Sequence, residues 1–408
     1  MALIVAKFGG TSVADVARIE KAAAKVAREV EAGHKVCVVV SAMSGVTNQL
    51  VGYCGEISQL YDTREYDVVV SSGEQITSGL MALALQKHGV AARSWLGWQI
   101  PFKTNDIHGK ARIEDIETDL LLDRLNKGEV CVVPGFQGVT NANRISTLGR
   151  GGSDTSAVAL AAALKADRCD IYTDVDGVYT TDPRIVPQAK KLKKISYEEM
   201  MELASLGAKV LQTRSVEIAM KQGVALQVLS SFEDHTGSDL PGTLVVKEEE
   251  IMEQELVSGI AYSRDEAKIT LLRVPDVPGV AAKVFSPLAK AAINVDMIVQ
   301  NVAADGKTTD ITFTVARTDL PKAIETIKAA DIDYGELLTA NDVAKISVVG
   351  IGMKSHSGVA DKMFQTLAGK GINIQVISTS EIKISVLVAE DYVELAVRSL
   401  HAAYGLEA

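Results

Sequence analysis

The sequence predicts an α/β protein with a large N-terminal domain built on a mainly parallel sheet, followed by a smaller duplicated region. Apolar runs of strand length alternate with amphipathic helical segments over the first ~240 residues. Strands that are apolar throughout, each followed by a helix, indicate a parallel sheet covered on both faces. Near the C-terminus, the stretch AKITLLRVPDVPGVAAKVFSPLAKAAINVDMIVQ returns as AKISVVGIGMKSHSGVADKMFQTLAGKGINIQVI. The repeat predicts two copies of one small module.

Composition is that of a soluble globular protein of two or three domains. The chain has 408 residues, 47% of them hydrophobic and 23% charged, with a net charge of −10 that argues against nucleic-acid binding. No apolar run reaches the ~20 residues needed to span a bilayer, and the first residues lack a signal peptide. The six histidines form no zinc motif. We expect a cytoplasmic protein whose reduced cysteines are buried, namely Cys37, Cys54, Cys131 and Cys169.

The N-terminal elements follow one another in a regular order. We expect a strand at 2–8, a helix at 13–31 whose apolar residues recur every three or four positions, and a strand at 35–41. A mixed helical region then runs to about residue 66, and the run YDVVV reads as a further strand before a helix that ends near QKHG. GEVCVVPGF is the next strand, SDTSAVALAAALKA an alanine-rich helix, and RCDIYTDVDGVY a strand with a tight turn.

Five polar loops follow these strands or lie between a strand and a helix. They are GGTS, SAMSG, SSGE, GRGGSDTS and TDVDGVYTTDPR. Ligands of parallel sheets bind at the carboxyl ends of the strands. We therefore expect the five loops to converge on one edge of the sheet.

A polar segment with Gly and Pro, SFEDHTGSDLPGTLVVKEEE, marks the end of the first domain near residue 245. The first repeat (256–342) supplies a β-α-β-β-α-β pattern, with helices near 279–292 and 320–330. The second (343–408) supplies only β-α-β-β-α. Our hypothesis is that LVSGIAYS (256–263) provides the missing edge strand and interlocks the two copies.

The segment KFGGTS places Lys7 at a strand end, followed by two glycines and by hydroxyl residues where a helix begins. Glycines let the backbone approach a phosphate, while helix N–H groups and a lysine bind its charge. The pattern is not a Walker A motif, so no P-loop fold follows. Taken alone, two glycines after a strand are also compatible with simple turn chemistry.

A second glycine cluster, LGRGGSDTSAVALAAAL, runs directly into a helix. An N-cap explains one Ser or Asp there, but not the whole group of Arg150, Gly151, Gly152, Ser153 and Asp154. Arg150 is suited to binding a carboxylate with two hydrogen bonds. Asp154 is suited either to holding Mg²⁺ or to orienting a phosphate-binding lysine.

In order and spacing, KFGGTS, VVSAMSGVTN, SSGEQ, GRGGSDTSA, YTDVDGVYTTDPR and SLGAKVLQTRSVE resemble the motifs of the aspartokinases, members of the amino-acid kinase family. The duplicated tail resembles the tandem ACT domains that aspartokinases carry. The resemblance covers essentially the whole chain. It implies a three-layer αβα sandwich with a mainly parallel sheet, the amino-acid kinase fold, followed by two ferredoxin-like βαββαβ ACT modules.

The same resemblance implies a reaction and a set of site residues. ATP, with Mg²⁺, would phosphorylate the β-carboxylate of L-aspartate to 4-phospho-L-aspartate, the first step towards lysine, threonine and methionine. Lys7, Asp154 and Lys209 would be catalytic. Nucleotide binding would fall to Lys7, Phe8, Gly9, Gly10, Ser41, Thr173, Asp174, Tyr179, Arg184 and Lys209, and aspartate binding to Thr47, Glu74, Arg150, Gly151, Gly152 and Ser153.

The ACT resemblance also implies feedback regulation by lysine, threonine or both. The second module has Gln375 where the first has Asp296, so we expect two unequal sites. We also expect a homo-oligomer, or a hetero-oligomer with a shorter subunit that starts near Met252. The effector ligands would be Asp276, Gly279, Ala281, Asn294, Asp296 and Gln300, with Asn373, Ile374, Thr379 and Ser380 from the partner module.

Alternatives remain open at this stage. Glu74 is equally typical of an acidic residue in the first turn of a helix, and Lys209 of a surface lysine. Related amino-acid kinases act on glutamate, N-acetylglutamate, UMP or carbamate, but they generally lack tandem effector modules. A catalytically silent amino-acid sensor is a further alternative, against which the complete set of charged motif residues argues.

Overall fold

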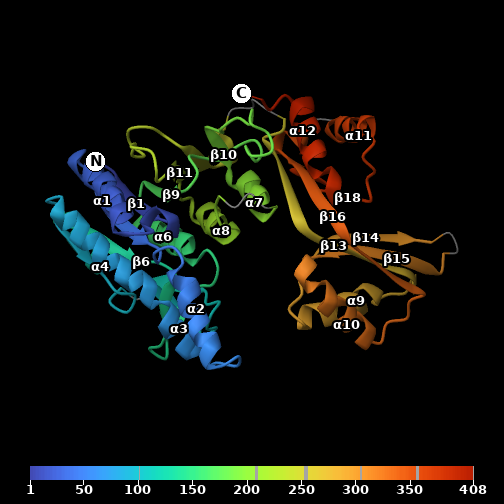
Figure 1. The fold of residues 1–408 in the computed structure, drawn as a ribbon, viewed down its shortest axis with the longest axis horizontal. Helices are drawn as coiled ribbons and strands as arrows, with labels where there is room; N and C mark the ends of the chain where they lie inside the picture. Colours follow the sequence, from blue (N-terminus) through green and yellow to red (C-terminus); the bar gives the residue numbers. More distant parts are fainter. Residues whose placement is uncertain (101, 207–209, 252–255, 304–305, 355–357, 408) are drawn as a thin grey trace. The chain divides into compact units, whose positions relative to one another are not determined.

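A computed structural model describes residues 1–407 except 101, 207–209, 252–255, 304–305 and 355–357. The chain divides into two compact units (Figure 1). The first comprises Met1–Val178, Lys191–Ala204 and Lys209–Met252; the second comprises Tyr179–Lys190, Ser205–Ala208 and Glu253–Ala408. The boundary near residue 245 stays a prediction.

The first unit is built on an eight-stranded sheet of order β10-β12-β11-β9-β1-β2-β6-β3. Its pairs are parallel except β11 with β12. The strands are β1 (Leu3–Phe8), β2 (Lys35–Val40), β3 (Ala92–Ser94), β6 (Val130–Pro134), β9 (Arg168–Thr173), β10 (Lys194–Ser196), β11 (Leu226–Ser230) and β12 (Thr243–Val246). The central strands β1, β2 and β6 are buried along nearly their whole length, as expected of a sheet covered on both faces.

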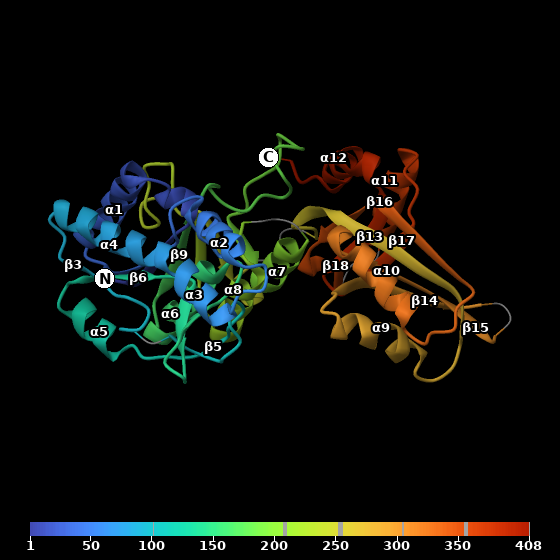
Figure 2. The same cartoon turned by 60° about the horizontal axis from the view of Figure 1, so that its bottom comes forward.

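Helices cover both faces of this sheet and confirm the expected α/β class. Helices α1 (Val16–Glu31) and α4 (Ser72–Lys87) lie side by side (Figures 1 and 2). Their apolar side chains pack in one core together with side chains of β1, β2 and β6. Helix α6 (Gly152–Leu164) contacts β1, β2 and β9 and packs against α8 (Thr213–Gln222). The other helices are α2 (Val46–Ile57), α3 (Thr63–Val70), α5 (Asp119–Asn126) and α7 (Tyr197–Ser205).

Two expected elements were wrong in detail. The first helix begins at Val16 rather than residue 13, because the Asp15 carboxylate accepts a hydrogen bond from Arg18 N and caps the helix there. The run YDVVV is not a strand but lies in α3. Asp62 caps this helix, Asp67 and Val70 are buried, and Val68 between them is exposed, which is a helical and not an alternating pattern.

A small second sheet in the first unit was not predicted from the sequence. It has the order β5-β4-β7-β8 and consists of β4 (Phe102–Thr104), β5 (Ile113–Ile116), β7 (Gln137–Thr140) and β8 (Ile145–Thr147). These strands are three or four residues long, which is too short for alternation of apolar residues to stand out.

The second unit contains a six-stranded sheet of order β14-β15-β13-β16-β18-β17. Its strands are β13 (Gly259–Pro275), β14 (Val295–Val302), β15 (Thr308–Val315), β16 (Glu336–Val349), β17 (Val376–Thr379) and β18 (Lys383–Ala389). Strands β13 and β16 each pass through both modules. Gly259–Ser263, the start of β13, pairs with Lys345–Val349 of the second module, and the rest of β13 pairs with β15 of the first.

Each module has its own helical layer and core. Helices α9 (Val280–Lys290) and α10 (Leu320–Ala329) pack together and share a core with β13 and β15. Helices α11 (Val359–Gly369) and α12 (Val393–Tyr404) likewise pack against each other and share a second core with β16 and β18 (Figure 1). The segment Ile185–Ala189 contributes apolar side chains to this second core.

One helical segment, Thr63–Lys87, is long and apolar enough to cross a membrane by length and composition alone. Half of its most apolar window is buried inside the protein, and it carries the buried carboxylates of Asp67 and Glu74. Both features are typical of the core helices of a globular protein. The four cysteines are free and buried, as expected.

Candidate active site

The carboxyl ends of β1, β2 and β9 meet the N-termini of α4 and α6 at one edge of the large sheet. Lys7 of β1 is only 7% exposed, and its Nζ lies 2.5 Å from Oδ1 of Asp154, in the first turn of α6. Residues from two predicted motifs therefore form one nearly buried ion pair. Asp154 is placed to orient Lys7, the second of the two roles considered for it.

The turn after β1 lies close to its neighbours. Gly9 N donates to Tyr172 O at 3.1 Å, and Ser41 N donates to Phe8 O at 3.1 Å. A Cβ on Gly9 would lie 3.4 Å from Lys7 Nζ, and a Cβ on Gly10 would lie 3.2 Å from Ala42 O. The absence of side chains at both glycines keeps the space in front of the lysine open.

The loop before α6 needs its glycines. Gly149 and Gly151 have φ values of +78° and +67°. A Cβ on Gly151 would lie 2.0 Å from Gln212 Cγ, so no other residue fits without displacement. Ser153 and Asp154 follow in the first turn of α6, where free backbone N–H groups and the helix dipole favour an anion. Arg150 is exposed at the tip of this loop.

Glu74 lies in the first turn of α4 and is 3% exposed. Gly73 beside it packs so closely on the end of β2 that a Cβ there would lie 2.8 Å from Ala42 Cβ. Burial raises the pKa of Glu74 to about 7, although backbone N–H groups of Ala42 and Glu74 itself partly stabilise the carboxylate. Oε2 is buried and makes no hydrogen bond within the described part of the chain. Such a group is suited to meeting a cation from a ligand.

The remaining predicted nucleotide and aspartate residues are only partly placed. Thr173 ends β9 in the first unit and Asp174 follows it, with Thr173 Oγ1 donating to Asp174 Oδ1 at 3.2 Å. Thr47 lies half-buried in α2. Tyr179 and Arg184 belong to the second unit, where Arg184 pairs with Asp182 at 2.7 Å. Lys209 lies outside the described residues. The nucleotide roles of these residues, and the aspartate role of Thr47, stay predictions.

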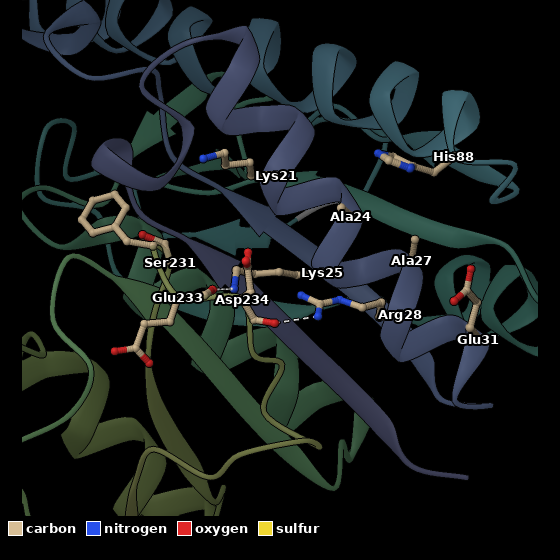
Figure 3. A pocket seen from close by; sticks show the side chains of 11 residues that line it. Lys21, Ala24, Lys25, Ala27, Arg28, Glu31, His88, Ser231, Glu233 and Asp234 are labelled. Atoms are coloured by element: carbon tan, nitrogen blue, oxygen red, sulfur yellow. Dashed lines mark hydrogen bonds between the residues drawn. The ribbon is translucent and has the colours of Figure 1, made fainter.

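A hollow of about 470 Å³ lies elsewhere, beside α1 (Figure 3). None of the predicted site residues lines it. Two of its basic side chains are already engaged: Lys25 Nζ donates to the backbone oxygens of Glu233 and His235, and Arg28 donates to Asp234 O (Figure 3). The glycine turns, and not this hollow, therefore mark the candidate active site.

The predicted effector residues gather around α9 and β14. Gly279, with φ +91°, precedes α9, and Asp276 N donates to Lys307 O at 2.9 Å. Ala281 lies in the first turn of α9. Asn294 precedes β14, which carries Asp296 and Gln300. In the second module, Asn373 and Ile374 precede β17, which ends at Thr379 beside Ser380. Strands β14 and β17 lie side by side, with Met297 and Val376 in one apolar cluster.

Asp296 has an ion-pair partner that sequence reasoning missed. Lys345 of β16 is 6% exposed, and its Nζ lies 2.6 Å from Asp296 Oδ2 and 2.9 Å from Glu266 Oε1. The pKa of Asp296 is lowered because the hydrogen bond and charge of Lys345 outweigh the effect of burial. The counterpart Gln375 accepts a hydrogen bond from Lys268 at 2.6 Å. The two modules thus differ in charge at equivalent positions.

Models of known families match both parts of the chain. The amino acid kinase family matches residues 2–230, and ACT domains match residues 268–331 and 346–404. An aspartokinase of Pseudomonas aeruginosa is 57% identical over the whole chain and 98% of its own length. An aspartokinase of Helicobacter pylori is 48% identical over 99% of the chain and all of its own length.

Solved structures agree with these matches. The structure of E. coli aspartokinase III with aspartate and ADP superposes with a TM-score of 0.81 at 28% identity, covering 98% of this chain and 99% of that one. Its complex with lysine and aspartate gives a TM-score of 0.77 at the same identity and coverage. Full-length similarity in sequence and fold leads to one conclusion: the chain belongs to the aspartokinases, within the amino acid kinase family.

Proposed function

We infer that this protein is an aspartate kinase, which transfers the γ-phosphoryl group of ATP to the β-carboxylate of L-aspartate. The observation that carries this inference is the Lys7–Asp154 pair between two glycine turns, with the buried carboxyl of Glu74 nearby in the first turn of α4. The family supplies the reaction, and these residues supply the charges that it needs. The product, 4-phospho-L-aspartate, is the first intermediate towards lysine, threonine and methionine.

The chemistry needs positioning and charge compensation more than proton transfer. A β-carboxylate oxygen of aspartate attacks the γ-phosphorus, and the bond from phosphorus to the bridging oxygen of ADP breaks. The attacking carboxylate is already ionised near pH 7, so no general base is required. Both reactants are anions, and Lys7 together with the N–H groups at the start of α6 would offset their repulsion. Glu74 would bind the ammonium of aspartate and Arg150 its α-carboxylate.

Mg²⁺ would enter with the nucleotide. The described residues contain no cluster of three metal-binding side chains. Mg²⁺ needs no such cluster when phosphate oxygens and water supply most of its ligands. Asp174, at the end of β9, is the carboxylate suited to this role, because Asp154 is engaged by Lys7. Bound Mg²⁺ would neutralise charge that develops on the phosphates.

The ACT modules would bind lysine, threonine or both and lower activity. The E. coli relative, whose structure with lysine is known, supports lysine as one effector. Asp296 would meet the effector's ammonium, and this would compete with its ion pair to Lys345. We further propose a cytoplasmic enzyme that assembles as a homo-oligomer or with a shorter subunit starting near Met252, a residue outside the described part of the chain.

A coupled ADP-release assay tests the proposed function. With ATP and Mg²⁺, we expect turnover with L-aspartate at least ~100-fold faster than with L-glutamate or N-acetyl-L-glutamate, because the pocket between Glu74 and Arg150 must fit the substrate in the transition state. Turnover with L-glutamate or N-acetyl-L-glutamate but not with L-aspartate would favour another amino-acid kinase. No ADP release with any of the three would favour an amino-acid sensor.

The pKa of Glu74 predicts a pH dependence. Only ionised Glu74 pairs with the substrate ammonium, so kcat/KM for L-aspartate is expected to rise about tenfold per pH unit below pH about 7 and to level off above it. Glu74→Gln should have a lower kcat/KM without this rise. An unchanged pH profile in Glu74→Gln would show that another group titrates.

Stability gives an independent check on the same carboxyl. The pKa of Glu74 is about 7 in the folded state, whereas in the unfolded chain it takes the ordinary glutamate value of 4.5. Between these two pH values the folded chain therefore holds the proton more tightly than the unfolded chain does. The free energy of unfolding should therefore fall as the pH rises from 4.5 to above 7, by about 3 kcal/mol from this group. Glu74→Gln should remove this part of the pH dependence in denaturant titrations without ligands.

A further inference from the structure

Asp67 is a fully buried carboxylate that the reaction described above does not use. It lies in α3 and is 0% exposed. Thr147 Oγ1 donates to its Oδ1 at 2.5 Å, His108 Nδ1 lies 2.7 Å from its Oδ2, and Gly109 N contacts both oxygens at 3.1 Å. Burial of a carboxylate costs free energy unless hydrogen bonds compensate for the lost water. These hydrogen bonds provide the compensation and hold the Asp67 side chain in one position. It joins α3 to β8 and to the loop after β4.

The segment that Asp67 holds leads directly to the substrate loop. Thr147 is the last residue of β8 and lies three positions before Arg150. Its carbonyl oxygen accepts from Ala111 N at 2.9 Å, and Leu148 N donates to Phe136 O at 2.9 Å. Thr147 is 0% exposed, so solvent cannot replace the hydroxyl's bond to Asp67.

Arg214 holds the same loop from another side. It belongs to α8, in the motif QTRSVE, to which no role was assigned above. Its Nη1 donates to Leu148 O and its Nη2 to Ala111 O, both at 3.0 Å. Burial lowers the pKa of Arg214, and its planar guanidinium binds the two carbonyls through two separate nitrogens in a fixed geometry, whereas a lysine has a single nitrogen.

We propose that Asp67 and Arg214 are positioning residues that hold the Thr147–Gly151 loop so that Arg150 meets the α-carboxylate of aspartate. The proposal rests on the proposed function, because it takes Arg150 as the aspartate ligand. The two residues act on backbone and hydroxyl groups before Arg150, while nucleotide binding by the turn after β1 does not depend on them. Their loss should therefore weaken aspartate binding selectively.

Thr147→Val against Thr147→Ser is the decisive pair, because valine keeps the shape of threonine and serine keeps the hydroxyl. Thr147→Val should raise the KM for L-aspartate about tenfold, as expected for one lost hydrogen bond to a buried charge, and leave the KM for ATP within about twofold. Thr147→Ser should recover most of the affinity. Arg214→Lys, which keeps the charge but not the fork, should show the same selective rise.

Several outcomes would overturn the proposal. Equal rises in both KM values, or an unchanged KM for L-aspartate in Thr147→Val, would show that the network only stabilises the fold. Thermal melting checks that each variant is folded, and if Thr147→Val does not fold, Arg214→Lys decides by the same criterion. Lys87→Ala, at an exposed lysine paired with Glu20, is the surface control. An inactive wild-type protein would instead refute the proposed function.

Discussion

Lys7→Ala is expected to lower kcat at least ~100-fold at saturating ATP and L-aspartate, comparable to the loss of one electrostatic transition-state contact. Lys7 lies beside the turn proposed to bind phosphate, and its Nζ lies 2.5 Å from Asp154 Oδ1. Because two anions must approach each other, the loss should appear mainly in kcat and less in either KM. The measurement is steady-state ADP release with both substrates varied.

The control must separate chemistry from stability. Lys7→Ala leaves the nearly buried Asp154 without its partner, and breaking such a pair destabilises by about 3–5 kcal/mol. The double variant Lys7→Ala with Asp154→Asn removes the unpaired charge. It should melt at a higher temperature than Lys7→Ala and remain equally inactive. Recovery of turnover in the double variant, or near-normal turnover in Lys7→Ala, would refute the role of Lys7.

Gly151→Ala should lower kcat/KM for L-aspartate about 100-fold, because it would displace the loop that carries Arg150. Its φ of +67° costs roughly 1 kcal/mol for alanine. More importantly, the added Cβ would lie 2.0 Å from Gln212 Cγ and 2.5 Å from its Cδ. Gln212 Cβ would also lie 2.7 Å away, so turning the exposed Gln212 side chain does not remove the clash and we expect the loop to shift. A displacement of about 1 Å can cost about 100-fold in rate. Initial rates at low L-aspartate give kcat/KM directly.

Two matched variants identify the cause of this loss. Gly89→Ala has a similar φ of +77° but nothing within 4 Å of its new Cβ, and it should keep nearly normal kcat/KM. Gln212→Gly in the Gly151→Ala background removes the clash and should restore most of the activity. If the double variant stays as inactive as Gly151→Ala, backbone strain and not the clash is responsible.

The sequence alone was sufficient for the main architecture and for the prediction of a site at the glycine clusters. Apolar strands alternating with helices gave the covered parallel sheet, and the repeat around Gly279 and Gly358 gave two modules of one kind. The glycine clusters lie after β1 and before α6, and loops at strand ends are where parallel sheets generally bind their ligands, so the same pattern predicted the site. These features are local, so periodicity and turn chemistry encode them within a few residues.

Other features could not be read from local patterns. YDVVV has the composition of a strand but forms part of α3, because the Asp62 cap, the burial of Val70 and the hydrogen bonds of Asp67 outweigh β-propensity. The short strands β4, β5, β7 and β8 are ordered by pairing with one another, and pairing partners are far apart in sequence. The pairing of segment 256–263 with the second module was only a hypothesis from the sequence. Which module an edge strand joins depends on how the two modules pack, and local patterns do not encode this.

The sequence by itself determined which residue types are present at the site: a lysine and glycines after one strand, and an arginine, glycines and an aspartate before one helix. Only the tertiary structure decided which of them meet. It pairs Lys7 with Asp154, Thr147 with Asp67 and Asp296 with Lys345. Each pair joins segments that the chain separates by at least 49 residues. Their contact depends on the packing of whole elements, which no local pattern specifies.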